Sequence, residues 1–134
     1  MFCLDTNIVV GIINGRAAAA ETRFRETVGR APLLLSAVVM FELRYGYAKS
    51  DRRSRMEAVL ATFLAPGVDV LPFDADDAAE AGDIRAALEA QGAPIGPYDI
   101  LIAAQARRRG AALVTLNRRE FERVPGLIVT DWAT

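Results

Sequence analysis

Short apolar segments alternate with longer helix-forming segments along the whole chain, and this alternation restricts the fold more than any other feature. The short segments are hydrophobic at consecutive positions, which is typical of strands buried on both faces of a parallel sheet. The predicted strands cover residues 1–4, 32–35, 68–71, 111–115 and 127–129. The pattern predicts an α/β domain in which helices cover both faces of a central parallel sheet.

Local signals bound the helices between these strands. Asp5-Thr6-Asn7 forms a turn that can cap the next segment, Ser36 can cap another, and Gly110 can end one. The predicted helices cover residues 8–13, 17–28, 37–48, 53–63, 74–90 and 97–109, and residues 117–123 are expected to form a polar turn. The length suits one domain over residues 1–134. The longest apolar runs are too short to span a membrane, so no membrane-spanning helix is expected.

The absence of histidine narrows the possible chemistry. Histidine is the commonest general base and the commonest transition-metal ligand. Any hydrolysis by this chain must therefore depend on carboxylates, which prefer hard ions such as Mg²⁺ or Mn²⁺. The single cysteine, Cys3, excludes an internal disulfide and, with an N-terminus unlike a signal peptide, predicts a cytoplasmic protein.

Charge is clustered although the formal net charge is only −1. Arginines group at residues 52–55, 107–109 and 118–123, and acids group at residues 74–83. Two interpretations remain open at this stage. The clusters can be solvated helix faces and helix ends, or the arginines can form basic patches that attract a phosphate backbone.

Three carboxylates each have a structural explanation and a functional one. Glu42 lies among apolar residues in a predicted helix, and a lone carboxylate is rarely buried unless it is paired or binds a metal. Asp99 lies in the first turn of a helix, where it could instead complement the helix dipole, and Asp5 could be a plain N-cap. For Glu42 the structural alternative is an ion pair, with Arg44 as one candidate.

Taken together, these acids indicate a metal site. Asp5 and Asn117 both follow predicted strands, and in a parallel sheet the carboxyl ends of the strands form the ligand-binding edge. Clustered acids repel one another unless a cation neutralises them, and a divalent metal could then activate water. We expect Asp5, Glu42 and Asp99 to hold the metal, with Glu120 and Asn117 in secondary roles at the same site.

Four motifs in order resemble those of PIN-domain proteins, and of VapC toxins in particular. They are Leu4-Asp5-Thr6-Asn7, then Leu35-Ser36-Ala37 with Phe41-Glu42-Leu43-Arg44-Tyr45-Gly46, then Pro97-Tyr98-Asp99-Ile100-Leu101-Ile102-Ala103-Ala104, and finally Val114-Thr115-Leu116-Asn117 with Glu120-Phe121. The resemblance covers essentially the whole chain. It implies a three-layer α/β/α fold and a Mg²⁺- or Mn²⁺-dependent endoribonuclease that acts on RNA. It also implies a homodimer controlled by a cognate antitoxin protein.

The resemblance also assigns roles to individual residues. Asp5, Glu42 and Asp99 match the acidic metal positions of the family, and Thr6 and Thr115 match its small hydroxyl residues. Relatives often have an aspartate where this chain has Asn117, and others have an asparagine there with an acid three residues later, as with Glu120 here. A dimer or partner surface is expected near Met40, Phe41, Tyr45, Tyr47 and Phe63, where apolar and aromatic residues concentrate.

Other functions receive less support from the sequence. No Gly-x-Gly-x-x-Gly follows the first strand, as a dinucleotide-binding enzyme would require. A phosphotransferase with Asp5 as nucleophile would want a second aspartate at the position of Asn7 and a well-placed lysine, and Lys49 is the only lysine. The remaining alternative is an inactive PIN-like module that binds RNA or protein.

Overall fold

The computed structural model describes residues 1–132, and its centre is one parallel sheet of five strands. The strand order is β3-β2-β1-β4-β5, so β1 lies in the middle with β2 and β4 as its neighbours. The strands are β1 (Phe2–Leu4), β2 (Leu33–Ser36), β3 (Val68–Leu71), β4 (Ala112–Val114) and β5 (Ile128–Thr130). Phe2 pairs with Leu33 on one side and with Ala112 on the other, which fixes the register.

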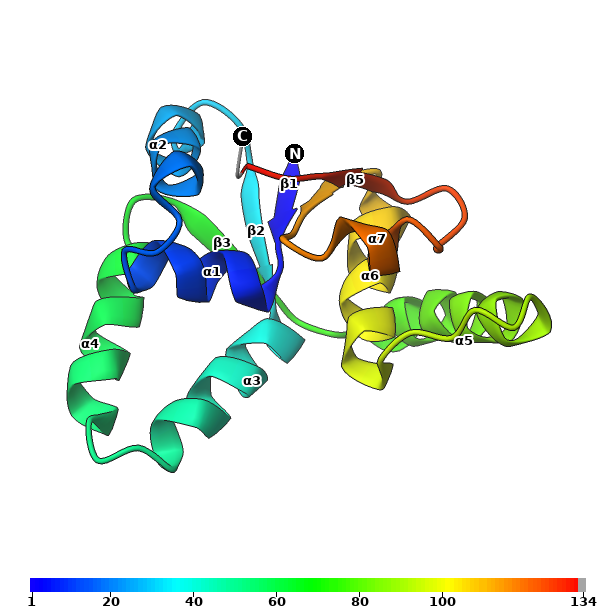
Figure 1. The fold of residues 1–134 in the computed structure, drawn as a ribbon, viewed down its shortest axis with the longest axis horizontal. Helices are drawn as coiled ribbons and strands as arrows, with labels where there is room; N and C mark the ends of the chain where they lie inside the picture. Colours follow the sequence, from blue (N-terminus) through cyan, green and yellow to red (C-terminus); the bar gives the residue numbers. More distant parts are fainter. Residues whose placement is uncertain (133–134) are drawn as a thin grey trace.

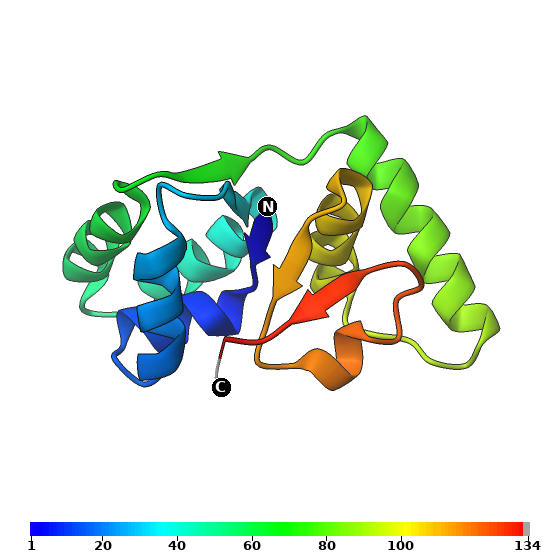
Figure 2. The same cartoon turned by 90° about the horizontal axis from the view of Figure 1, so that it is seen from above.

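Helices form the two outer layers. They are α1 (Thr6–Ile13), α2 (Ala18–Thr27), α3 (Ala37–Ala48), α4 (Arg53–Leu64), α5 (Ala75–Ala90), α6 (Pro97–Arg109) and α7 (Arg118–Phe121). Figures 1 and 2 show α1 to α4 together on one side of the sheet and α5 and α6 on the other. The expected three-layer α/β/α architecture is therefore confirmed. None of the helices in residues 1–132 combines the length and apolar character that a membrane span needs.

The connections between the strands explain this arrangement and locate the ligand-binding edge. From β1 the chain moves outward through β2 to β3, and it then crosses back over the sheet to β4 on the other side of β1. Right-handed crossovers place the helices of these two halves on opposite faces. The order reverses between β1 and β4, and open parallel sheets bind ligands at such a switch point, beyond the carboxyl ends of the strands.

Most predicted elements agree with the structure to within one or two residues. Ser36 caps α3 by accepting a hydrogen bond from the Val38 amide at 3.0 Å, and Gly110 ends α6 with a φ of 66°. The prediction of a plain polar turn at 117–123 was wrong, because residues 118–121 form the single helical turn α7. Phe121 supplies the reason, since its side chain is fully buried and anchors the turn to the core.

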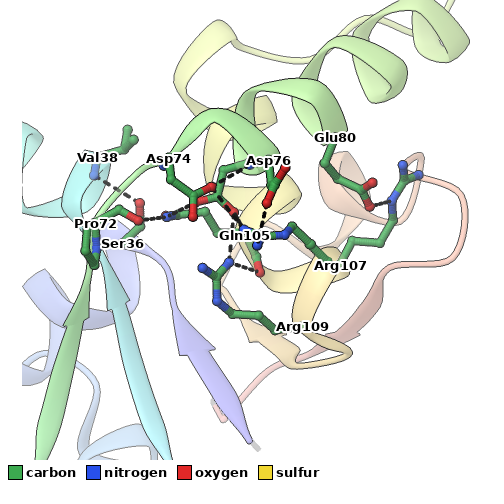
Figure 3. A network of polar contacts seen from close by, with 11 residues as sticks. Ser36, Val38, Pro72, Asp74, Asp76, Glu80, Gln105, Arg107 and Arg109 are labelled. Carbon is green, nitrogen blue, oxygen red and sulfur yellow. Dashed lines mark hydrogen bonds and ion pairs between the residues drawn. The ribbon is translucent and has the colours of Figure 1, made fainter.

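A buried network joins α5 to α6 and explains one of the arginine clusters (Figure 3). Asp77 is fully buried, and its carboxylate accepts hydrogen bonds from Arg108 at 2.6 Å, Arg109 at 3.0 Å and Gln105 at 3.0 Å. Arg107 pairs with Glu80 at 2.7 Å. The arginines at 107–109 are therefore structural partners of the acids at 74–83, and the interpretation as helix ends holds for this cluster.

Candidate active site

The structure brings the predicted site residues together at the carboxyl edge of the sheet. An open cleft of about 510 Å³ lies beyond β1 and β4. It is lined by Asp5, Thr6, Asn7, Val10, Gly11, Arg16, Ala17, Glu42, Asp99, Leu116 and Asn117. Asp5 and Asn117, which are far apart in the sequence, line the same cleft as expected. Glu120 lies directly beside Asp99, with which it shares a hydrogen bond.

Asp5 has both of its carboxylate oxygens oriented by neighbours. It is the N-cap of α1, where Oδ1 accepts a hydrogen bond from the Thr6 amide at 2.8 Å. Oδ2 accepts from the hydroxyl of Thr115, at the end of β4, at 2.7 Å. The side chain is only 4% exposed. The N-cap interpretation and the site interpretation are therefore compatible, because one carboxylate starts the helix and faces the cleft.

Glu42 approaches the cleft from α3 and is partly buried. Its Oε1 accepts a hydrogen bond from the Thr6 hydroxyl at 2.9 Å, so Thr6 links the first acid to the second. The alternative of an ion pair with Arg44 fails, because the cationic group of Arg44 lies 3.9 Å from Glu57 instead. Glu42 thus faces the cleft with one donor and no ion pair among the described residues 1–132.

Asp99 and Glu120 form the other wall of the site. Gly96 is the N-cap of α6, and its amide donates a hydrogen bond to Oε1 of Glu120 at 3.0 Å. A side chain at position 96 would crowd the acids, since a Cβ there would lie 3.2 Å from Oδ2 of Asp99. Asn117 donates from its side-chain amide to the other oxygen of Glu120. Glu120 therefore holds the start of α6 against the turn after β4.

The carboxylates perturb one another's proton affinity. Burial, a hydrogen bond with Glu120 and the nearby charges of Asp5 and Glu42 raise the pKa of Asp99 to about 7. Burial also raises the pKa of Asp5, and the Thr115 and Thr6 hydrogen bonds only partly offset this effect. For Glu120, burial is outweighed by the hydrogen bonds from Gly96, Asp99 and Asn117, and its pKa is lowered. Below about pH 7, the metal-free site therefore holds a proton on Asp99, which donates a hydrogen bond to the Glu120 carboxylate.

The donor set of the cleft fits a hard divalent cation. All candidate ligands are oxygens, and burial together with the neighbouring acids raises the pKa of Asp99 and Asp5, so a bound cation would favour their charged forms. Within residues 1–132, no three acidic or cysteine side chains have the geometry of a formed metal site. Mg²⁺ usually binds one or two carboxylates directly and keeps several waters, so it does not require three converging ligands.

Sequence reasoning missed two contributors to this site. Asn7 accepts a hydrogen bond from the Leu116 amide at 3.2 Å, so it joins α1 to the turn after β4. Arg16 lines the cleft beside the acids. The adjacency of Asn7 to Asp5 was a usable signal, because both follow β1. Arg16 gave no signal, since it follows α1 in a loop whose direction the sequence does not reveal.

Comparison with known proteins gives a consistent assignment. The family model for the PIN domain matches residues 2–127. The tRNA(fMet)-specific endonuclease VapC of Shigella flexneri is 45% identical over 132 residues, which is 98% of both chains. The protein of the same name from Salmonella typhimurium is 40% identical over 131 residues, covering 98% of this chain and 97% of that one.

Solved structures agree with the sequence comparison. In the structure of VapBC2 from Rickettsia felis bound to a promoter DNA fragment, one chain superposes with a TM-score of 0.91 at 33% identity, covering 98% of both chains. In DNA-bound VapBC from Salmonella typhimurium, the TM-score is 0.89 at 40% identity, covering 98% of this chain and 97% of that chain. The chain therefore belongs to the PIN-domain family. Its relatives within that family are VapC ribonucleases.

Proposed function

We propose that this chain is the toxin of a type II toxin–antitoxin pair and a Mg²⁺-dependent endoribonuclease that hydrolyses RNA phosphodiester bonds. The observation that carries the proposal is that Asp5, Glu42 and Asp99 line one cleft at the switch point of the sheet, with Glu120 beside Asp99. A relative named as an endonuclease is 45% identical to it. Mg²⁺ is the expected cofactor and Mn²⁺ the alternative.

The residues of the cleft have distinct proposed tasks. Asp5, Glu42 and Asp99 would hold the ion, which supplies a Lewis acid that lowers the pKa of water and stabilises charge on the leaving oxygen. Thr6 and Thr115 orient Glu42 and Asp5 through hydroxyl donors at 2.9 and 2.7 Å, so these carboxylates keep their free lone pairs toward the cleft. Glu120 positions Asp99 through their hydrogen bond, and Asn117 holds Glu120 in place.

RNA cleavage by the purified protein tests this proposal. We expect a labelled RNA to be cut in Mg²⁺ or Mn²⁺, cutting to stop in EDTA, and added Mg²⁺ to restore it. Asp5→Asn and Glu42→Gln should each abolish cutting, whereas Glu89→Gln, an exposed acid on α5, should behave as wild type. RNA that is bound but never cut would favour the inactive binding module, and cutting that survives EDTA would contradict the metal role.

The names of the relatives suggest the first substrate to try. Two relatives at 45% and 40% identity are named tRNA(fMet)-specific endonucleases. We therefore propose initiator tRNA as the substrate of this chain, and a cytoplasmic site of action where that RNA is found. Sequencing of RNA ends after controlled expression should reveal one recurrent cut in this tRNA. Recurrent cuts confined to another RNA would reject the substrate and keep the nuclease.

An antitoxin is the second proposed partner, since solved relatives are VapBC complexes. A hollow lined by apolar side chains including Met56 and Val59, and by Arg52 and Arg55, adjoins the acidic cleft, and Val10 lines both. A partner segment seated in this hollow would extend over the acids and block RNA. Coexpression with the cognate antitoxin should suppress cleavage, and Met56→Asp should restore it. Suppression that Met56→Asp leaves intact would place the partner elsewhere.

We also propose a homodimer formed through exposed aromatic side chains. Phe41, Tyr45 and Tyr98 are 52%, 59% and 47% exposed, and the rings of Phe41 and Tyr98 lie 5.5 Å apart. The expected surface is thus partly corrected, because Tyr47 and Phe63 are buried in the core instead. Light scattering at micromolar concentration should give twice the monomer mass for wild type and less for Tyr45→Ser. A wild-type monomer would contradict the dimer.

A further inference from the structure

Arg16 is the only basic side chain that lines the acidic cleft in the described part of the chain. It is exposed, and it shares the cleft with Asp5, Glu42 and Asp99. Within residues 1–132 it forms no ion pair with these acids or with any other carboxylate. This contrasts with Arg107–Arg109, whose guanidinium groups are taken up by acids of α5. The guanidinium of Arg16 is therefore free to contact a ligand.

The loop that carries Arg16 is held firmly against α1. Gly15 turns the chain with a φ of +69°, and the amides of Arg16 and Ala17 then donate to the Gly11 carbonyl at 2.9 and 3.1 Å. A Cβ on Gly11 would lie only 3.0 Å from the Cβ of Ala17, so glycine at position 11 allows the loop to pack closely against α1. Since Asp5 caps the same helix, α1 fixes the position of Arg16 relative to the first acid.

A cleft lined by carboxylates attracts a metal ion but repels the phosphates of an RNA strand. A cation at its wall removes this conflict, and a guanidinium is well suited because it binds phosphate oxygens through two parallel N–H donors. An arginine that instead served to neutralise the acids would be paired with them, which is not observed for Arg16 in residues 1–132. Its free guanidinium and its location together indicate a role in holding the substrate.

We propose that Arg16 binds a backbone phosphate of the RNA next to the scissile bond and so positions the strand over the carboxylates. This inference rests on the proposed ribonuclease function. A phosphate contact contributes mainly to substrate binding, so its removal should raise KM more than it lowers kcat. It should also weaken the dependence of RNA binding on salt by about one counterion.

Arg16→Ala and Arg16→Lys test the proposal, with Arg30→Ala as the matched control. Arg30 is also exposed and its loss changes the net charge equally, but it lies with Pro32 and Gly67 at the opposite edge of the sheet. We expect Arg16→Ala to raise KM about 10-fold with kcat within about 3-fold of wild type. The KM of Arg16→Lys should lie between those of wild type and Arg16→Ala, since lysine keeps the charge but not the two-donor geometry. Arg30→Ala should match wild type.

Fluorescence anisotropy with an RNA oligonucleotide in EDTA separates this proposal from the nuclease function. Weaker RNA binding by Arg16→Ala than by Arg30→Ala, with a shallower salt dependence, supports the contact even if wild type cuts no RNA. Equal binding and equal KM for these two variants would overturn the role of Arg16 while leaving the nuclease intact. A loss of kcat alone would also overturn it, because that result places Arg16 outside substrate binding.

Discussion

Replacing Asp99 with asparagine should make the metal-free protein more stable at alkaline pH, although Asp99 lies at the centre of the candidate site. Burial, a hydrogen bond with Glu120 and the charges of Asp5 and Glu42 raise the pKa of Asp99 from 3.8 to about 7. Above that pH the ionised carboxylate faces three other acids. The amide of asparagine can donate a hydrogen bond to Glu120 as the protonated acid does, but it never ionises.

The pKa sets both the direction and the size of this effect. An acid whose pKa is higher in the folded protein contributes stability below its unfolded pKa, and that contribution is lost as the pH rises through the folded value. For Asp99 the loss falls between about pH 4 and pH 7. The difference between the folded and unfolded pKa corresponds to about 4 kcal/mol of unfolding free energy for a fully buried group. Partial solvent exposure of Asp99 reduces this contribution to about 2 kcal/mol. We expect Asp99→Asn to raise Tm by about 5–10 °C.

Thermal melts in EDTA at pH 8 and pH 5 measure this effect. The gain should appear at pH 8 and nearly vanish at pH 5, because wild-type Asp99 is then already protonated. Glu89→Gln serves as the control, since Glu89 is 57% exposed and pairs with Arg85 on the surface. Its Tm should change little at either pH. A lower Tm for Asp99→Asn than for wild type at pH 8 would refute the reasoning and make Asp99 a structural acid.

Further predictions concern the surroundings of the site and the scaffold. Glu120→Gln should raise the Mg²⁺ concentration for half-maximal cleavage about 10–100-fold, and Asn117→Ala should do so more weakly; a titration of Glu120→Gln that superimposes on wild type would remove Glu120 from the site. Asp77→Asn should lower the free energy of unfolding by about 3 kcal/mol in urea melts, because it leaves the guanidinium groups of Arg108 and Arg109 without their buried partner. Burial opposes the ionisation of Asp77, but hydrogen bonds from Gln105 and these arginines lower its pKa, so its stabilising effect should persist above about pH 4 and decline below it in acid melts.

The sheet and the order of its elements could be predicted because apolar runs and caps are local signals. Ser36 and Gly110 mark the ends of helices through their own backbone requirements, and the structure confirms both. The carboxyl edge followed from the parallel arrangement, which placed Asp5 and Asn117 in one cleft. The location of the site could therefore be predicted from general rules of sheet topology.

Contacts between segments that are distant in the chain could not be predicted from the sequence. The hydrogen bond from the Gly96 amide to Glu120 joins two loops, and no local pattern specifies how closely they approach. The sequence placed Asp77 in an acidic cluster that could be a solvated helix face, whereas tertiary packing buries it against α6. The loop that carries Arg16 packs closely against Gly11, and this contact is a property of tertiary packing and not of helix propensity.

The hydrogen bond from Thr115 to Asp5 joins residues 110 positions apart, and this separation has a bearing on protein synthesis. A nascent chain that has not reached residue 115 can contain Asp5 and Glu42, but it lacks both the hydroxyl that orients Asp5 and the acid that pairs with Asp99. Contacts of such long range form late, because the intervening chain must first be ordered. The acidic cleft can therefore be complete only after the C-terminal part of the chain has been synthesised and has folded against β1.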